Sequence, residues 1–175
     1  MPDAEAARRA SRIKLVLCDN DGVLTDGTVY VSDRGEELKQ YSLRDGMGVE
    51  RLRNRGIATA IVTREVSDIV HRRGQKLALP FVWTGIRDKR AHLGRMLEEA
   101  KVTAEQVAYI GDDVNDLGII HAIAPLGLTA APADAMPEVQ DAVHLVCRNP
   151  GGKGAFRDLA EWIVRHQLEG RATNE

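Results

Sequence analysis

Near its N-terminus the chain reads LVLCDNDGVLTDG over residues 15–27, an apolar run that leads into two carboxylates and a glycine-containing turn. The run predicts a buried strand with Asp19 and Asp21 at its end. In an extended chain, side chains two residues apart face the same way, so both carboxylates can meet one substrate. Two carboxylates this close repel each other unless a cation or a special chemistry uses them. The pair indicates a nucleophile (Asp19) and a proton donor (Asp21) around a divalent cation; the alternative is an ordinary Asp-Gly turn.

Composition places the chain among single-domain globular proteins. It has 175 residues, 43% hydrophobic and 29% charged, enough to bury one core. A net charge of -2 argues against a nucleic-acid binder. No apolar segment approaches the length of a membrane span, and residues 1–10 lack the apolar region of a signal peptide. Cys18 and Cys147 have no metal-ligand spacing, so we expect buried thiols in a reducing compartment, the cytoplasm.

Short apolar segments alternate with amphipathic ones along most of the chain. Strands are predicted at 13–18, 57–63, 81–84, 107–111, 126–130 and 143–147, and helices at 45–56, 66–79, 88–101, 113–123 and from 155 onward, with a turn or short helix at 137–142. This alternation predicts an α/β fold: a three-layer, doubly wound, mostly parallel sheet. A β-hairpin is expected over about 27–43, and Asp45 is expected to cap the helix that follows it. The expected domain is 12–169, between a polar lead-in (1–11) and a C-terminal tail (170–175).

Polar residues follow several of these predicted strands. Asp19 and Asp21 end the first, Thr63 ends the second, and Gly111-Asp112-Asp113 ends a later one, while Lys89 opens a helix between the last two. Ligands of such sheets bind beyond the carboxyl ends of the strands. Four elements therefore bring acidic, hydroxyl and ammonium groups to one edge, which favours a catalytic site over an ordinary turn.

These residues resemble the four motifs of the haloacid dehalogenase superfamily. The motifs are Asp19-Asn20-Asp21-Gly22, Thr63, Lys89 and Gly111-Asp112-Asp113-Val114-Asn115-Asp116, in the expected order and spanning most of the chain. The resemblance implies that Asp19 is the nucleophile and forms a phosphoaspartate. It implies that Asp21 protonates the leaving alcohol and later deprotonates the attacking water. Thr63 and Lys89 would hold the phosphoryl oxygens; Thr63 could also cap the following helix.

The same resemblance implies a Mg²⁺ site. The ion would be bound by the Asp19 carboxylate, the Asp21 backbone carbonyl and Asp112, with Asp113 or Asp116 in support. Elementary chemistry agrees, because a phosphate dianion repels a carboxylate nucleophile unless cations neutralise the charge. An oxygen-only ligand set also suits Mg²⁺. Alternatively, Asp116 belongs only to the first turn of a helix, where acidic residues are common.

The chain leaves no room for the cap domain that most members of this superfamily insert after the first or second motif. It is similar to the capless KDO-8-phosphate phosphatase family, whose members are tetramers. The similarity includes residues 22–27, Arg44-Asp45-Gly46-Met47-Gly48 and the glycine-rich segment 151–157. We therefore expect a homotetramer in which the hairpin and the glycine-rich segment complete neighbouring sites.

That family acts on 2-keto-3-deoxy sugar acid phosphates of eight or nine carbons. Its KDO-8-phosphate members typically read Thr-Gly-Arg at the second motif, whereas this chain reads Thr63-Arg64-Glu65. Glu65 with Arg73 and Lys76 looks like the branch acting on KDN-9-phosphate and N-acylneuraminate-9-phosphate; Arg64 fits neither branch. The predicted substrate contacts are Asp45, Gly46, Arg64, Glu65, Arg73 and Lys76. The alternative for Glu65, Arg73 and Lys76 is a solvated helix face.

Two other functions remain possible at this point. One is a phosphatase acting broadly on sugar phosphates. The other is a catalytically silent oligomerisation module, as in some CMP-sialate synthetases. Silent domains tend to lose the equivalents of Asp19, Asp21 or Lys89, and this chain keeps all three.

Overall fold

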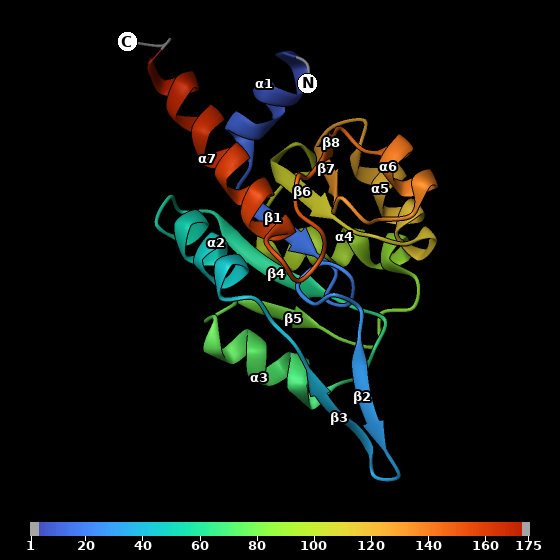
Figure 1. The fold of residues 1–175 in the computed structure, drawn as a ribbon. Coiled ribbons are helices and arrows are strands. Elements are labelled where there is room, and N and C mark those ends of the chain that lie inside the picture. Colours follow the sequence, from blue (N-terminus) through green and yellow to red (C-terminus); the bar gives the residue numbers. More distant parts are fainter. Residues whose placement is uncertain (1–3, 173–175) are drawn as a thin grey trace.

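A six-stranded sheet forms the centre of the computed structural model, which describes residues 4–172 (Figure 1). Its strands lie in the order β5-β4-β1-β6-β7-β8, and every pairing is parallel. The bounds are β1 Leu15–Cys18, β4 Ala58–Val62, β5 Phe81–Trp83, β6 Val107–Ile110, β7 Leu128–Ala131 and β8 Leu145–Val146. The predicted α/β fold is confirmed, with β1 in the middle of the sheet, where strands covered on both faces need near-continuous apolar sequences.

Helices cover both faces of the sheet. Alternate residues of β1 separate the two cores: Val16 packs with α1 Ala4–Arg12, α2 Leu43–Arg53, α3 Asp68–Lys76 and α7 Ala155–Ala172. Leu17 faces the other way, into a core that includes α4 Lys89–Ala100, α5 Leu117–Ile123 and α6 Pro137–Ala142. Short 3₁₀ turns at Ala104–Gln106 and Val114–Asp116 precede β6 and α5. The layers are therefore helices, sheet, helices, as expected.

The predicted polar lead-in is wrong for the residues that the structure describes. Residues 4–12 form α1, which lies beside α7 (Figure 1). Ala6 and Ala10, one helical turn apart, are buried in the interface, and small side chains there let the two helices approach closely. At the other end α7 continues to Ala172, so the tail predicted from 170 is helical up to that point, and 173–175 lie outside the described residues.

Helix α2 begins before the predicted cap. Ser42 is the N-cap and accepts a hydrogen bond from the Arg44 N–H, so the expectation that Asp45 caps this helix is wrong. Asp45 lies in the first turn and is 1% exposed. Its carboxylate accepts the backbone N–H groups of Gly154 (3.2 Å) and Arg157 (2.9 Å). Asp45 thus ties α2 to the start of α7.

The hairpin stands apart from the main sheet. Strands β2 (Val29–Ser32) and β3 (Gly35–Lys39) pair antiparallel and project from the body below the carboxyl end of β1 (Figure 1). Between Thr63 and Lys89 the chain holds only α3, β5 and short loops, so no cap domain is inserted there. Within residues 4–172, no helix has both the length and the apolar character to cross a membrane.

Candidate active site

A cleft lies beyond the carboxyl ends of β1, β4 and β6. It is lined by Asp19, Asp21, Gly22, Gly27, Thr63, Arg64, Glu65, Asp112, Asp113 and Asn115. The predicted convergence of these strand ends is therefore present in the structure. The cleft wall is mostly carboxylate, amide and hydroxyl, which suits a polar ligand whose negative charge is balanced by cations.

Gly22 lets the loop after β1 approach the fourth motif, which contains Asp112. Its φ of +81° is accessible mainly to glycine, and a Cβ at this position would lie 1.9 Å from the Asp112 Oδ2. Any side chain here would collide with that carboxylate. The glycine after Asp21 is therefore required for both the turn and the closeness of the two loops.

Lys89 is buried between two carboxylates. Its Nζ lies 2.6 Å from the Asp19 Oδ2 and 2.7 Å from the Asp116 Oδ1. The residue is only 3% exposed, at the start of α4, where Asp88 caps the helix by accepting the Ala91 N–H. Burial alone would lower the pKa of Lys89, but the two carboxylates outweigh it and raise the pKa. The ammonium therefore stays charged beside the predicted nucleophile.

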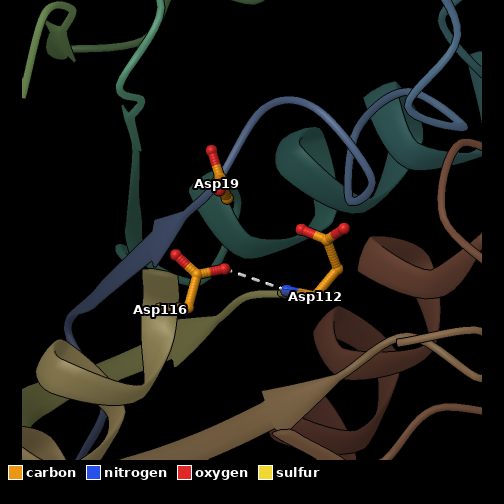
Figure 2. Close-up of side chains that lie close together, drawn as sticks. All are labelled: Asp19, Asp112 and Asp116. Atoms are coloured by element: carbon orange, nitrogen blue, oxygen red, sulfur yellow. Dashed lines mark hydrogen bonds between the residues drawn. The ribbon is translucent and has the colours of Figure 1, made fainter. Parts of the chain in front are cut away.

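Asp116 acts as the hub of this network, and Tyr109 is a partner that the sequence did not indicate. The fully buried Tyr109 hydroxyl donates to Asp116 Oδ1 (2.7 Å) and accepts from Lys89 Nζ (3.1 Å). Asp116 Oδ2 accepts the Asp112 backbone N–H at 3.0 Å (Figure 2). Because Tyr109 lies within an apolar strand, it reads as a core residue. Only the hydroxyl's position next to Lys89 reveals its second role.

Three carboxylates form a group that fits a divalent cation. Asp19, Asp112 and Asp116 each place one oxygen within 4.8 Å of the others (Figure 2). Burial, and then the charges of Asp19 and Asp116, raise the pKa of Asp112 to about 8. Burial raises the pKa of Asp19 to about 7, although Lys89 opposes the shift. Such crowding of hard oxygen ligands is what Mg²⁺ relieves. Asp19 and Asp112 line the cleft, whereas Asp116 is fully buried and does not, so Asp19 and Asp112 are the better placed ligands.

These raised pKa values predict how metal removal changes stability with pH. A carboxyl whose pKa is higher in the folded than in the unfolded chain, where it is about 3.9, binds protons preferentially when folded. The free energy of unfolding should therefore fall as pH rises from about 4 towards the values of about 7 and 8 for Asp19 and Asp112. Mg²⁺ binds the ionised carboxylates, so it should stabilise the protein more at pH 8 than at pH 5.

Thermal unfolding with EDTA or Mg²⁺ at both pH values measures this effect. An Asp112→Asn variant should lose most of the Mg²⁺-dependent rise in Tm, whereas Asp141→Asn, an exposed position on α6, should keep it. An equal Mg²⁺ effect at both pH values would contradict the assignment of these carboxylates to the metal.

Asp21 has a charged partner that comes from the hairpin. Lys39 Nζ, at the end of β3, lies 2.7 Å from Asp21 Oδ1, and its side chain is 3% exposed. Asn20 Nδ2 also donates to this oxygen, at 3.1 Å. No sequence pattern indicates this role for Lys39, because an isolated lysine in a polar hairpin is normally a solvated side chain.

The second motif is split between an anchored hydroxyl and exposed charges. Thr63 is 1% exposed, and its Oγ1 accepts the Glu65 backbone N–H at 3.2 Å. Helix α3 is preceded by Ser67 instead, so Thr63 does not cap it. Arg64 and Glu65 are exposed and line the cleft beside Thr63. They are therefore within reach of a ligand held there.

The other predicted substrate contacts lie outside the cleft lining of this chain. Arg73 donates to the Ser42 carbonyl at 3.0 Å and packs over the Tyr41 ring, 5.0 Å from its centre. Gly46 faces the same guanidinium, since a Cβ there would lie 3.2 Å from it. Lys76 is exposed near the end of α3. The Asp45 carboxylate is engaged in its hydrogen bonds to Gly154 and Arg157. None of these four residues lines the cleft.

The glycine-rich segment packs against the catalytic loop of its own chain. Gly152 donates its N–H to the Val23 carbonyl at 2.9 Å, and a Cβ on Gly151 would lie 1.9 Å from the Gly22 carbonyl oxygen. The Gly151 N–H donates to Asp134 at 2.9 Å. The glycines are thus accounted for by close packing behind the loop that carries Asp19 and Asp21.

Comparisons of sequence and of structure find the same kind of protein. No family model matches the chain. It is 38% identical over 168 residues to the 3-deoxy-D-manno-octulosonate 8-phosphate phosphatase KdsC of Yersinia pestis, covering 95% of this chain and 88% of the relative. The cobalt-bound phosphatase of Haemophilus influenzae has a TM-score of 0.87 at 38% identity, with 91% and 92% of the two chains covered.

A third similar protein has been solved with ligands. It is the 3-deoxy-D-manno-octulosonate 8-phosphate phosphatase of Moraxella catarrhalis, in complex with a magnesium ion, a phosphate ion and a KDO molecule. The likeness has a TM-score of 0.87 at 30% identity and covers 97% of this chain and 95% of that one.

Proposed function

Since the chain belongs to the family of 3-deoxy-D-manno-octulosonate 8-phosphate phosphatases, within the haloacid dehalogenase superfamily, we propose that it is a Mg²⁺-dependent phosphatase of a 2-keto-3-deoxy sugar acid phosphate. The observation that carries the proposal is the buried ion pair of Lys89 with Asp19, beside Asp112 and facing the cleft. A structural ion pair would not require a second, uncompensated carboxylate at its side.

The chemistry proceeds in two displacements. The Asp19 carboxylate attacks phosphorus and forms a phosphoaspartate, while the sugar oxygen leaves with a proton from Asp21. Water then attacks phosphorus and gives a proton to Asp21, which releases inorganic phosphate and restores the Asp19 carboxylate. Lys89 and the Thr63 hydroxyl hold phosphoryl oxygens whose charge changes in the transition state.

Mg²⁺ would be held by Asp19 and Asp112, with the Asp21 carbonyl as a further ligand and Asp113 or Asp116 in support. When bound, it neutralises phosphate charge and lets an anionic nucleophile approach. Support comes from the crowded oxygen ligands of this chain and from the magnesium and cobalt ions in the two similar structures.

For the substrate we propose KDO-8-phosphate, with KDN-9-phosphate and N-acylneuraminate-9-phosphate as competitors. The similar proteins named above act on the eight-carbon compound, whereas the second motif of this chain, with Glu65, favours the nine-carbon branch. Arg64 and Glu65 line the cleft, where an arginine suits a carboxylate and a glutamate accepts hydrogen bonds from hydroxyls. Arg73 and Lys76 stay candidate contacts only if they move or serve a neighbouring chain.

Turnover of the three compounds with Mg²⁺ tests the substrate. We expect kcat/KM for one of them to exceed that for simple sugar phosphates by about 10²-fold or more, because a missing hydrogen-bonded group is costly in a polar site. Equal, slow rates on all compounds would favour the broad sugar-phosphate phosphatase. The lining of the cleft is consistent with that alternative, because few of its side chains other than Arg64 and Glu65 are free to contact the sugar.

Assembly into a homotetramer would cover the open site. The hairpin exposes Tyr30, Val31 and Leu38, an unusual set of apolar side chains for a projecting ribbon. The hairpin supports this proposal; the glycine-rich segment does not, because it packs on its own chain. Light scattering measures the mass of the assembly, and a monomer in solution would contradict the proposal. The proposed location is the cytoplasm, since Cys18 and Cys147 are free and buried.

A further inference from the structure

A buried lysine of the hairpin, Lys39, contacts Asp21, the predicted acid-base residue. Lys39 Nζ lies 2.7 Å from Asp21 Oδ1 and 3.0 Å from Glu36 Oε2, and its side chain is almost fully buried. Lysine is seldom buried to this degree unless it is paired. The position of Lys39 is therefore set by the two carboxylates and not by solvent.

Asp21 depends on this contact more than on its other neighbours. Its Oδ1 also meets Asn20 Nδ2 at 3.1 Å and Thr25 Oγ1 at 3.5 Å, which are uncharged and longer. Its Oδ2 has no hydrogen-bond partner among the described residues. Charge-assisted hydrogen bonds are about twice as strong as neutral ones, so Lys39 dominates the placement of this side chain.

Glu36 connects Lys39 to a second loop. The Ser67 hydroxyl donates to Glu36 Oε1, and Glu36 Oε2 pairs with Lys39. Ser67 belongs to the segment between Thr63 and α3, whereas Asp21 belongs to the loop after β1. The contacts Ser67–Glu36–Lys39–Asp21 thus run through the hairpin and connect two loops that line the active site.

We propose that Lys39 is a positioning residue that holds Asp21 where it can exchange a proton with the leaving oxygen, with Glu36 holding Lys39. This rests on the function proposed above. A general acid must lie about 2.6–3.2 Å from its partner oxygen. Among the described residues, Lys39 is the only charged side chain paired with the Asp21 carboxylate. The hairpin is then part of the acid-base machinery as well as a surface for assembly.

The effect of removing Lys39 should depend on the leaving group. A sugar alkoxide needs a proton as it departs, whereas p-nitrophenolate is a stable anion and leaves without one. Lys39→Met should lower kcat/KM for KDO-8-phosphate about 10- to 100-fold, part of the usual contribution of general acid-base catalysis. For p-nitrophenyl phosphate the loss of kcat/KM should stay below about 3-fold. This ratio covers only the steps up to departure of the alcohol, so it does not include the later hydrolysis in which Asp21 acts as base for both compounds. Lys39→Arg should restore part of the lost kcat/KM.

Arg95→Met is the matched control, because Arg95 also forms an ion pair, with Glu99, but on the exposed surface of α4. It should leave both rates unchanged. A Tm and an assembly mass equal to those of the wild type would show that Lys39→Met is folded. If Lys39→Met does not fold, Glu36→Gln is measured in its place. It should show the same dependence on the leaving group with a smaller loss of activity.

Two outcomes would overturn the inference. In one, the folded variant loses the same factor on both compounds, which assigns Lys39 to general support of the fold or assembly. In the other, neither rate changes. Failure of the proposed function is a different result, since the wild-type chain would then hydrolyse neither compound before any residue is changed.

Discussion

Asp19→Asn is expected to lower kcat by about 10⁴-fold or more, the scale seen when a nucleophile that acts with its neighbours is removed. The amide cannot attack phosphorus, and it replaces an anion that lies 2.6 Å from Lys89. The measurement is steady-state turnover of KDO-8-phosphate with Mg²⁺. The fold should persist, because asparagine has nearly the same shape and still accepts the Asn20 N–H on its oxygen.

The covalent step can be checked separately. Acid quench during turnover, followed by borohydride reduction, converts a phosphorylated aspartate into homoserine, which peptide mass spectrometry locates. Homoserine should be found in place of Asp19 in the wild-type chain and in an Asp141→Asn control, and it should be absent from Asp19→Asn. An Asp19→Asn variant with full activity, or homoserine in place of another aspartate, would refute the mechanism.

Lys89→Met is expected to remove activity and to lower the free energy of unfolding by about 3–5 kcal/mol. The loss is large because two carboxylates, those of Asp19 and Asp116, stay buried without their shared cation. The partners raise the pKa of Lys89, so its stabilisation is complete at pH 7 and is lost only as pH rises through that raised value. Urea unfolding at pH 7 without Mg²⁺ measures the change.

A second substitution separates the two effects of Lys89. Asp116→Asn removes one uncompensated charge, so the double variant Lys89→Met/Asp116→Asn should regain much of the stability but none of the activity. Equal stability of the single and double variants would show that Lys89 does not stabilise the fold through Asp116. Full activity of either would exclude Lys89 from phosphoryl binding.

Much of the fold could be predicted because it is encoded locally. Apolar strands alternate with amphipathic helices, and the hairpin has a turn between two short strands. The error at α1 has a physical cause. Within residues 5–12 only Ala6 and Ala10 are buried, and two alanines form an apolar helix face only when α7 packs against them. The cap of α2 was ambiguous, since Ser42 and Asp45 are both good capping residues. The bonds from Asp45 to α7 decided between them.

By itself the sequence determined which side chains reach the catalytic edge. Asp19, Thr63 and Asp112 follow strands, and parallel strands bring their carboxyl ends to one edge whatever the details of packing. Only the tertiary structure decided how those side chains are paired: Lys89 with Tyr109, and Asp21 with Lys39. The reason is that periodicity fixes the face and the end at which a residue lies. Ion pairs and hydrogen bonds between distant segments depend on how helices, strands and the hairpin pack together.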